Sequence, residues 1–197
     1  MTPERKHRIN EVLRHRQNDL TVILENVHDP HNISAVMRSC DAVGISEIYV
    51  LNNRIGRHKR WGERSSSSAS KWMVIHQFTE TEACFQQVRK KYHNIFSTHL
   101  NETASDLYNL DLTQPVALVF GNEGEGITEE SLTNCDGNFI IPQVGMIQSL
   151  NISVACAVTI YEAMRQKRLA GHYNESRLKE SEKAALIEYW QIPSANE

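Results

Sequence analysis

Short apolar runs, rich in β-branched and aromatic residues, recur along the chain in the way typical of buried strands. They predict strands over residues 20–25, 47–51, 73–78, 94–98, 115–120 and 138–141. The intervening segments carry apolar residues at helical spacing. They predict helices over residues 4–16, from Asp29 or Asn32 to Val43, over 79–92 and 128–133, from Ser149 or Asn151 onward, and over 174–190. This alternation indicates an α/β fold with a mostly parallel sheet flanked by helices.

Two helix boundaries carry specific local signals. Gly44 follows the helix predicted to end at Val43, and glycine suits the left-handed position after a helix C-terminus. The spacing Thr79-x-x-Glu82 predicts a capping box at the start of the helix that ends near Tyr92.

The composition is that of an ordinary globular domain. Of the 197 residues, 40% are hydrophobic and 23% are charged, which excludes a disordered chain, a collagen-like repeat and a coiled-coil rod. No apolar run approaches the roughly 18 residues of a membrane span, and the charged N-terminus lacks a signal-peptide core. A cytoplasmic protein is therefore expected. The four cysteines form no CxxC pair, and neither they nor the scattered histidines predict a metal site.

Three short basic segments interrupt an otherwise acidic chain of net charge −3. Residues 1–20 carry five Lys/Arg against three acidic residues, residues 54–71 six against one, and residues 165–179 five against one. If the fold gathers these segments on one face, they form a phosphate-binding surface. The alternative is that they are ordinary solvated faces. Residues 54–71 also contain a serine run at 65–68, and they predict a long loop of a kind that is often functional.

Three segments that follow predicted strands contain residues suited to chemistry, because open α/β sheets build their sites at the carboxyl ends of strands. The first runs from Glu25 to Arg38. Asn32 and Arg38 lie six residues apart, so both can reach a ligand that crosses the opening turns of the helix. The plainer alternatives are an N-cap for Asn32 and a surface ion pair for Arg38.

The second segment is Gly121-Asn122-Glu123-Gly124-Glu125-Gly126. Its glycines permit positive φ angles and a close approach of the backbone to a ligand, but it lacks the Gly-Lys-Ser/Thr ending of a P-loop. Its two glutamates favour a positively charged or amine-bearing ligand over a phosphate. The alternative is a flexible acidic turn.

The third segment leads from Ile141 through Ser149 and Leu150 to Asn151. Here a predicted strand gives way to a loop and then to a helix. Backbone amides at a helix start can bind a carboxylate. The alternative is that Ser149 and Asn151 only cap the helix.

Taken together, these segments resemble the three signature motifs of the SpoU branch of the SPOUT RNA methyltransferases. The matching residues are Asn32-x5-Arg38, then Gly121-Asn122-Glu123-Gly124, then Ile141-Pro142 followed by Ser149-Leu150-Asn151. The resemblance spans at least residues 20–165. It implies a deep C-terminal trefoil knot, which general rules of chain topology do not predict. It also implies a homodimer that uses S-adenosylmethionine, with a basic helical arm at 1–19, a catalytic domain at 20–164 and a basic, helical RNA-binding extension at 165–197.

The resemblance assigns roles to individual residues by position. The cofactor pocket would be lined by Thr98, Gly121, Ile141 and Leu150. The catalytic group would consist of Arg38 together with Asn32, Glu123, Ser149 and Asn151. A guanidinium stays protonated at ordinary pH. Arg38 would therefore act either as a strongly perturbed base or by binding the neighbouring phosphate, and both routes for the proton stay open.

Within the family, the run from Arg5 to Arg16 and residues 20–28 resemble the TrmH subfamily, which methylates the 2′-hydroxyl of guanosine-18 in tRNA. The basic arms would then bind RNA phosphates. The residues expected to do so are Arg5, Arg8, Arg16, Arg165, Arg168 and Arg177. Two alternatives are the same chemistry at another tRNA position or on ribosomal RNA, and a non-catalytic RNA-binding protein on the same fold.

Overall fold

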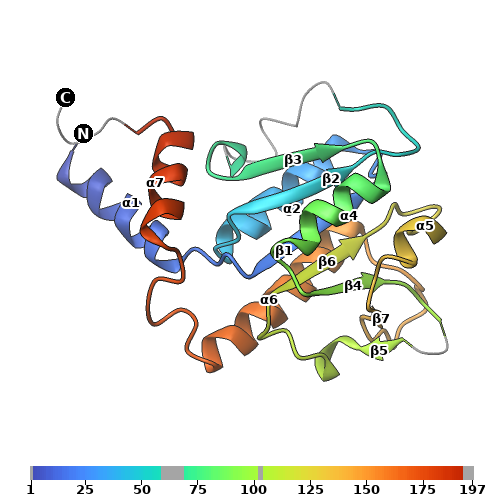
Figure 1. The fold of residues 1–197 in the computed structure, drawn as a ribbon. Helices are drawn as coiled ribbons and strands as arrows, with labels where there is room; N and C mark the ends of the chain where they lie inside the picture. Colours follow the sequence, from blue (N-terminus) through green and yellow to red (C-terminus); the bar gives the residue numbers. More distant parts are fainter. Residues whose placement is uncertain (1, 59–68, 102–103, 193–197) are drawn as a thin grey trace.

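Seven parallel strands form one sheet at the centre of the computed structural model, which describes residues 2–58, 69–101 and 104–192 (Figure 1). The strands are β1 (Leu20–Glu25), β2 (Glu47–Leu51), β3 (Val74–Phe78), β4 (Asn94–Thr98), β5 (Ser105–Asp106), β6 (Val116–Phe120) and β7 (Gly137–Ile140). Their order across the sheet is β3-β2-β1-β6-β4-β7-β5. Every neighbouring pair is parallel. The predicted α/β class with a mostly parallel sheet is therefore confirmed.

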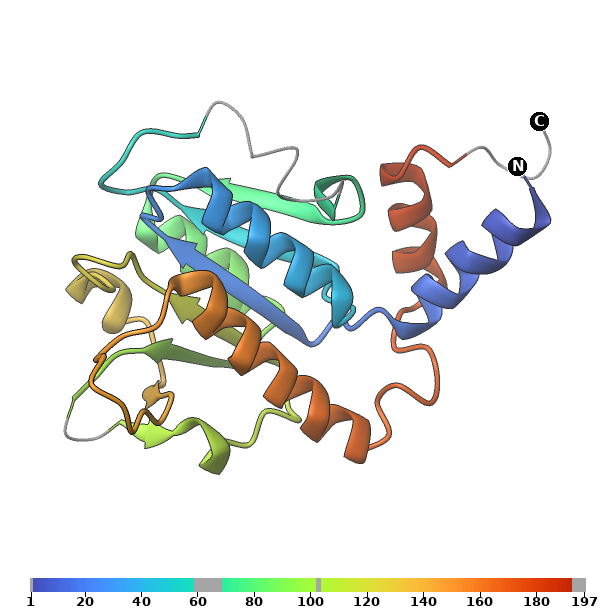
Figure 2. The same ribbon diagram turned by 180° about the vertical axis from the view of Figure 1, so that it is seen from behind.

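Helices cover both faces of the sheet. Helices α2 (Pro30–Ala42) and α6 (Ile152–Leu169) lie side by side on one face (Figure 2), and α4 (Thr81–Arg89) covers the other. Alternate residues of strand β1 pack against the helices on opposite faces of the sheet. Val22 and Leu24 pack into the cluster that contains α2 and α6, whereas Ile23 packs with residues of α4. A central strand that is buried on both faces reads as a continuous apolar run, which is why this strand was predictable.

Two terminal helices pack against each other beside the sheet (Figure 1). Helix α1 (Pro3–His15) contributes Leu13, while α7 (Glu180–Tyr189) and its flanks contribute Leu178, Leu186 and Trp190. The rings of Trp190 and Trp72 pack in a T-shaped arrangement with centroids 5.5 Å apart. This apolar cluster joins both ends of the chain to the body of the protein.

Strands 20–25, 47–51 and 94–98 have the predicted bounds, but two helix starts were predicted wrongly. Helix α4 begins at Thr81 with Glu80 at its N-cap, and no side chain caps it, so the Thr79–Glu82 box does not form. The last helix begins at Glu180 rather than Asn174. The preceding segment is held against the body instead, where Tyr173 donates a hydrogen bond to the Val43 carbonyl.

Three further features complete the fold. The strand β5, two residues long, was not predicted, because so short a strand carries no alternating pattern. Short helix α5 (Glu129–Leu132) follows the glycine-rich segment and has Thr128 as its N-cap. Helix α6 continues without a break across the domain boundary expected between residues 164 and 165. In the described ranges, no helix is long and apolar enough to cross a membrane.

Candidate active site

Asn32, Glu123 and Asn151 meet at the carboxyl edge of the sheet. Asn32 stands in the first turn of α2, Glu123 follows β6, and Asn151 precedes α6. The Asn32 Nδ2 donates to Glu123 Oε1 over 3.1 Å, and the Asn151 Nδ2 donates to the same oxygen over 2.9 Å. Asn151 Nδ2 also lies 3.1 Å from Asn32 Oδ1, to which it donates. The fold thus joins all three predicted segments through one carboxylate.

Helix capping explains why both amides are available to Glu123. Asp29, not Asn32, caps α2 by accepting a hydrogen bond from the His31 amide over 2.8 Å. The Asn32 side chain is therefore free to reach across to Glu123. Asn151 caps α6 through its Oδ1, which accepts from the Ser153 amide over 2.9 Å. Its amide nitrogen donates instead to Asn32 and Glu123. Capping therefore explains the role of the Asn151 oxygen but not that of its nitrogen.

The segment from Gly121 to Gly126 is a closed loop. Asn122 and Gly126 exchange two backbone hydrogen bonds of 3.1 and 3.0 Å. The Asn122 side chain accepts from the backbone amides of Gly124 and Glu125. A Cβ atom on Gly121 would lie 2.2 Å from the Gly126 carbonyl carbon, so only glycine fits there. Gly126 has a φ of 73°, which is the left-handed region that glycine adopts without strain.

A cavity of about 830 Å³ opens beside this loop. All four predicted cofactor residues, Thr98, Gly121, Ile141 and Leu150, line it, as do Glu123 and Ser149. Apolar walls from Phe139, Ile141 and Leu150 suit an adenine ring and a thioether chain, and the Glu123 carboxylate suits a cation. The volume lies within the usual range for small-molecule sites.

Arg38 lies apart from this cluster. Its exposed side chain stands farther along α2 and does not line the cavity. It forms no hydrogen bond or ion pair with any residue in the part of the chain that the structure describes. The alternative of a surface ion pair within the chain is therefore not realised there.

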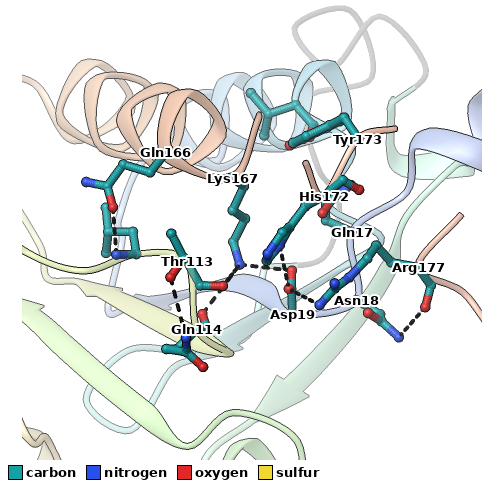
Figure 3. Close-up of polar contacts among 12 residues, drawn as sticks. Gln17, Asn18, Asp19, Thr113, Gln114, Gln166, Lys167, His172, Tyr173 and Arg177 are labelled. Carbon is teal, nitrogen blue, oxygen red and sulfur yellow. Dashed lines mark hydrogen bonds and ion pairs between the residues drawn. The ribbon is translucent and has the colours of Figure 1, made fainter. Parts of the chain in front are cut away.

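The expected RNA-binding residues divide into exposed and engaged side chains. Arg5 and Arg8 are exposed on α1, and Arg168 is exposed at the end of α6. Arg165 is also exposed, and it pairs with Glu162 over 2.8 Å. Arg177 lies 3.1 Å from the buried carboxylate of Asp19, which Lys167 and His172 also approach (Figure 3). Residues 59–68, the centre of the expected basic loop, lie outside the described residues.

Arg16 is corrected from an RNA contact to a structural residue. Its side chain is fully buried. Its guanidinium donates to Asp41 over 2.7 Å, to the Ile45 carbonyl over 2.8 Å and to the Trp72 carbonyl over 2.9 Å. It also lies 5.5 Å from the centre of the Trp190 ring. A guanidinium enclosed in this way cannot reach a phosphate, and a count of basic residues cannot reveal that enclosure.

One acidic residue beside the site was not predicted to matter. Glu25 ends strand β1 and is fully buried, and its carboxylate accepts hydrogen bonds from residues that follow the glycine loop. The signal in the sequence was a charged residue at the end of an otherwise apolar strand. Cys84 and Cys135, by contrast, are unsuited to nucleophilic chemistry, since burial raises the pKa of both thiols to about 12.

Comparisons with known proteins identify the family of the chain. The sequence profile of the SpoU rRNA Methylase family matches residues 19–161. The chain belongs to the SpoU rRNA methylase family. It is 45% identical over 177 residues to a tRNA (guanosine(18)-2′-O)-methyltransferase of Thermus thermophilus, covering 90% of each chain. It is 39% identical over 189 residues to the Escherichia coli protein of the same name, covering 95% of this chain and 82% of that one.

Solved structures of SpoU proteins share the fold. The A. aeolicus TrmH/SpoU tRNA modifying enzyme is 33% identical, with a TM-score of 0.88 over 97% of this chain and 98% of that chain. The SpoU methyltransferase AviRb from Streptomyces viridochromogenes, in complex with AdoMet, is 27% identical. Its TM-score is 0.70, over 79% of this chain and 63% of that chain. The match to the SpoU fold therefore extends over nearly the whole chain.

Proposed function

We propose that this protein transfers a methyl group from S-adenosylmethionine to the ribose 2′-hydroxyl of guanosine-18 in tRNA. The observation that carries the proposal is the meeting of Asn32, Glu123 and Asn151 beside a cavity lined by Thr98, Gly121, Ile141 and Leu150. The curated relatives named for this reaction match over 90% of the chain or more.

The residues of the site divide the work of the reaction. When bound, S-adenosylmethionine supplies an electrophilic methyl group. The chain must then hold the ribose in line and allow its 2′-hydroxyl to lose a proton. The carboxylate of Glu123 fixes the Asn32 and Asn151 amides, which orient the ribose with the help of Ser149. The same carboxylate offers a negative charge to a cationic cofactor.

Arg38 is proposed to act on the RNA. Its guanidinium stays charged, and no described residue of the chain occupies it. It is therefore available for the phosphate next to the target ribose. A cation at that phosphate favours the ionised form of the hydroxyl, which lowers the hydroxyl pKa without requiring arginine to accept the proton.

The trefoil knot, the homodimer and a cytoplasmic site of action are part of this proposal. The dimer is supported by apolar side chains that α6 leaves exposed. Val154 and Tyr161 lie seven residues apart on α6, and they are 48% and 52% exposed. Side chains of this kind on one face are suited to burial against a second copy. Light scattering should give the mass of a dimer for the wild type and of a monomer for Tyr161→Glu, and a monomeric wild type would refute the dimer.

The proposed activity is tested by methyl transfer to an unmodified tRNA transcript. Label from S-adenosylmethionine should appear as 2′-O-methylguanosine after digestion of the RNA to nucleosides. Label in another nucleoside would move the target within tRNA, and label only on ribosomal RNA would favour the rRNA alternative. Cofactor binding without transfer to any RNA would favour the non-catalytic RNA-binding alternative.

A further inference from the structure

We propose that Glu25 is a positioning residue for methyl transfer, because its buried carboxylate fixes the glycine loop and thereby Glu123. The inference rests on the proposed function, and it concerns a residue outside the cavity and outside the expected catalytic group. Glu25 lies at the carboxyl end of β1 and is 0% exposed. A buried carboxylate is costly unless it is fully hydrogen-bonded, so its partners show what it holds in place.

The partners of Glu25 lie directly after the glycine loop. Its Oε2 accepts from the Thr128 backbone amide over 3.0 Å. Its Oε1 accepts from the Thr128 hydroxyl and from the Ser131 hydroxyl, each over 2.7 Å. A fourth, longer hydrogen bond comes from Asn53 Nδ2 over 3.3 Å. Three of the four donors therefore belong to the segment that begins α5.

These hydrogen bonds fix one end of the loop that carries Glu123. Strand β6 holds the loop at Gly121, and backbone hydrogen bonds between Asn122 and Gly126 close it on itself. The closed loop can still shift as a unit unless its other end is fixed as well. Thr128 is that end, and it donates to Glu25 through both its amide and its hydroxyl. Glu25 thus determines where Glu123 meets Asn32 and Asn151.

A second layer of contacts ties Glu25 to two neighbouring elements. Asn53, which follows β2, donates to Thr81 over 2.8 Å as well as to Glu25. Asn26 donates to Asn53 over 2.6 Å and accepts from the Arg54 amide over 3.0 Å. Asn26 has a φ of 51°, so the chain turns sharply between β1 and the segment that leads to Asn32. The same network therefore positions both sides of the Asn32–Glu123 contact.

The test compares Glu25→Gln with a matched carboxylate at the other end of the same strand. The glutamine keeps the size of the side chain, but its NH₂ group is a donor. It must therefore face at least one of the groups that donate a hydrogen bond to the carboxylate, and that hydrogen bond is lost. Asp19 immediately precedes β1, is 5% exposed, and pairs with Lys167 over 3.0 Å (Figure 3). Asp19→Asn therefore perturbs a similarly buried carboxylate whose side-chain partners, Lys167, His172 and Arg177, lie outside the cavity and the glycine loop.

The two variants should differ in cofactor binding and turnover. With Glu25→Gln, the Kd for S-adenosylmethionine from calorimetry should rise about fivefold or more, the size expected for one unmade buried hydrogen bond. The turnover rate should fall on the order of 10²-fold, since small displacements of catalytic groups cost that much. With Asp19→Asn, the Tm should fall while the cofactor Kd stays within about twofold of the wild type. That change is smaller than the rise of about fivefold expected when a buried hydrogen bond at the site is lost. Equal effects of both variants on Kd would mean that Glu25 is only structural, and the proposal would fail.

Two further measurements keep the inference testable if Glu25→Gln folds poorly or if the protein methylates no RNA. Ser131→Ala removes one 2.7 Å hydrogen bond to Glu25 without touching the loop, and it should raise the cofactor Kd in the same direction. Amide hydrogen exchange at residues 122–128 should quicken in Glu25→Gln and not in Asp19→Asn. Unchanged exchange there would overturn the positioning role, whereas an inactive wild type would overturn only the proposed function.

Discussion

Glu123 is the residue on which the site depends most. Its Oε1 accepts from Asn32, from Asn151 and, over 3.4 Å, from the Ile152 backbone amide. The side chain is exposed, so solvent weakens each contact and the cluster adds little stability. Its role is to orient the two amides. One carboxylate oxygen sets the positions of two amides that the sequence places far apart.

Replacement of Glu123 by alanine should abolish most activity. The Asn32 and Asn151 amides lose their common acceptor, so turnover should fall by at least about 10²-fold, as expected when catalytic groups lose their orientation. Glu125→Ala is the matched control, because Glu125 lies in the same loop and lines the same cavity, whereas its side chain forms a 3.4 Å ion pair with Arg54 and contacts neither amide. Single-turnover methyl transfer measures both variants, and equal losses would contradict the role of Glu123.

Arg38→Ala should separate catalysis from cofactor binding. Arg38 does not line the cavity, so the Kd for S-adenosylmethionine should stay at the wild-type value. Turnover should fall by on the order of 10²–10⁴-fold, the usual range when a group that assists proton loss is removed. Calorimetry and a filter-binding methylation assay give the two values. A parallel loss of cofactor affinity would show that Arg38 supports the cavity instead.

At the scale of elements, the glycine loop is the most sensitive part of the site. Gly121→Ala places a methyl group 2.2 Å from the Gly126 carbonyl carbon, so the loop must shift. Cofactor affinity should fall by at least about tenfold, because a displaced backbone cannot be relieved by side-chain rotation. Gly56→Ala is the control, since no atom of the described residues, apart from its two chain neighbours, lies within 4 Å of the position that its added methyl group would take. Calorimetry with S-adenosylmethionine measures both, and an unaffected Gly121→Ala would contradict the observed loop geometry.

Strand β2 carries a carboxylate that should make stability depend on pH. Burial alone would raise the pKa of Glu47, but hydrogen bonds involving His76 and Tyr92 and the charge of Lys91 outweigh it and lower the pKa to about 2. A depressed pKa stabilises the fold above the unfolded value of 4.5, and this contribution is lost as the pH falls from 4.5 toward 2. It amounts to at most about 3 kcal/mol.

Urea unfolding between pH 2 and pH 6 tests this contribution. The difference in unfolding free energy between the wild type and Glu47→Gln should be largest near pH 6 and should shrink as the pH falls. The comparison removes the contributions of other carboxylates, which titrate in both proteins. A difference that stays constant across this range would refute the low pKa of Glu47.

Elements were predictable where a local pattern was enough. Strand β1 is buried on both faces and reads as a continuous apolar run, so its bounds followed from the sequence. The cap of α2 was ambiguous between Asp29 and Asn32, since both residue types cap helices. Only the packing of α2 against its neighbours decides that Asp29 caps and Asn32 faces Glu123. The start of α7 likewise depends on tertiary contacts such as that of Tyr173 with Val43.

At the scale of the whole molecule, strand order creates the site. Strand β1 pairs with β6, so the segments after these strands lie side by side although Asn32 and Glu123 are 91 residues apart. Periodicity along the chain does not reveal this pairing, and the family resemblance was needed to predict that the segments meet. Charge patterning placed Arg16 and Arg177 with the RNA-binding residues. The structure instead buries Arg16. It holds Arg177 against Asp19 but leaves that side chain 41% exposed, so an RNA contact of Arg177 stays a prediction.

The exposed basic residues of α1 should govern RNA affinity. Arg5→Ala and Arg8→Ala should each weaken tRNA binding to a similar extent across sequences. Each should also reduce the slope of log affinity against log salt by somewhat less than one, because one phosphate contact is lost. Lys90→Ala is the control, because Lys90 lies at the end of α4, which covers the face of the sheet opposite α2 and α6. Fluorescence anisotropy over a salt series measures the slopes, and an unchanged slope in both arginine variants would remove α1 from the RNA interface.

The central claim is that this chain methylates the 2′-hydroxyl of guanosine-18. The most direct test maps the methyl group by mass spectrometry in a tRNA transcript incubated with the protein and S-adenosylmethionine, alongside a transcript with adenosine at position 18. We predict one 2′-O-methyl group at guanosine-18 of the first transcript and none in the second. Methylation at another position, or equal methylation of both transcripts, would contradict the account.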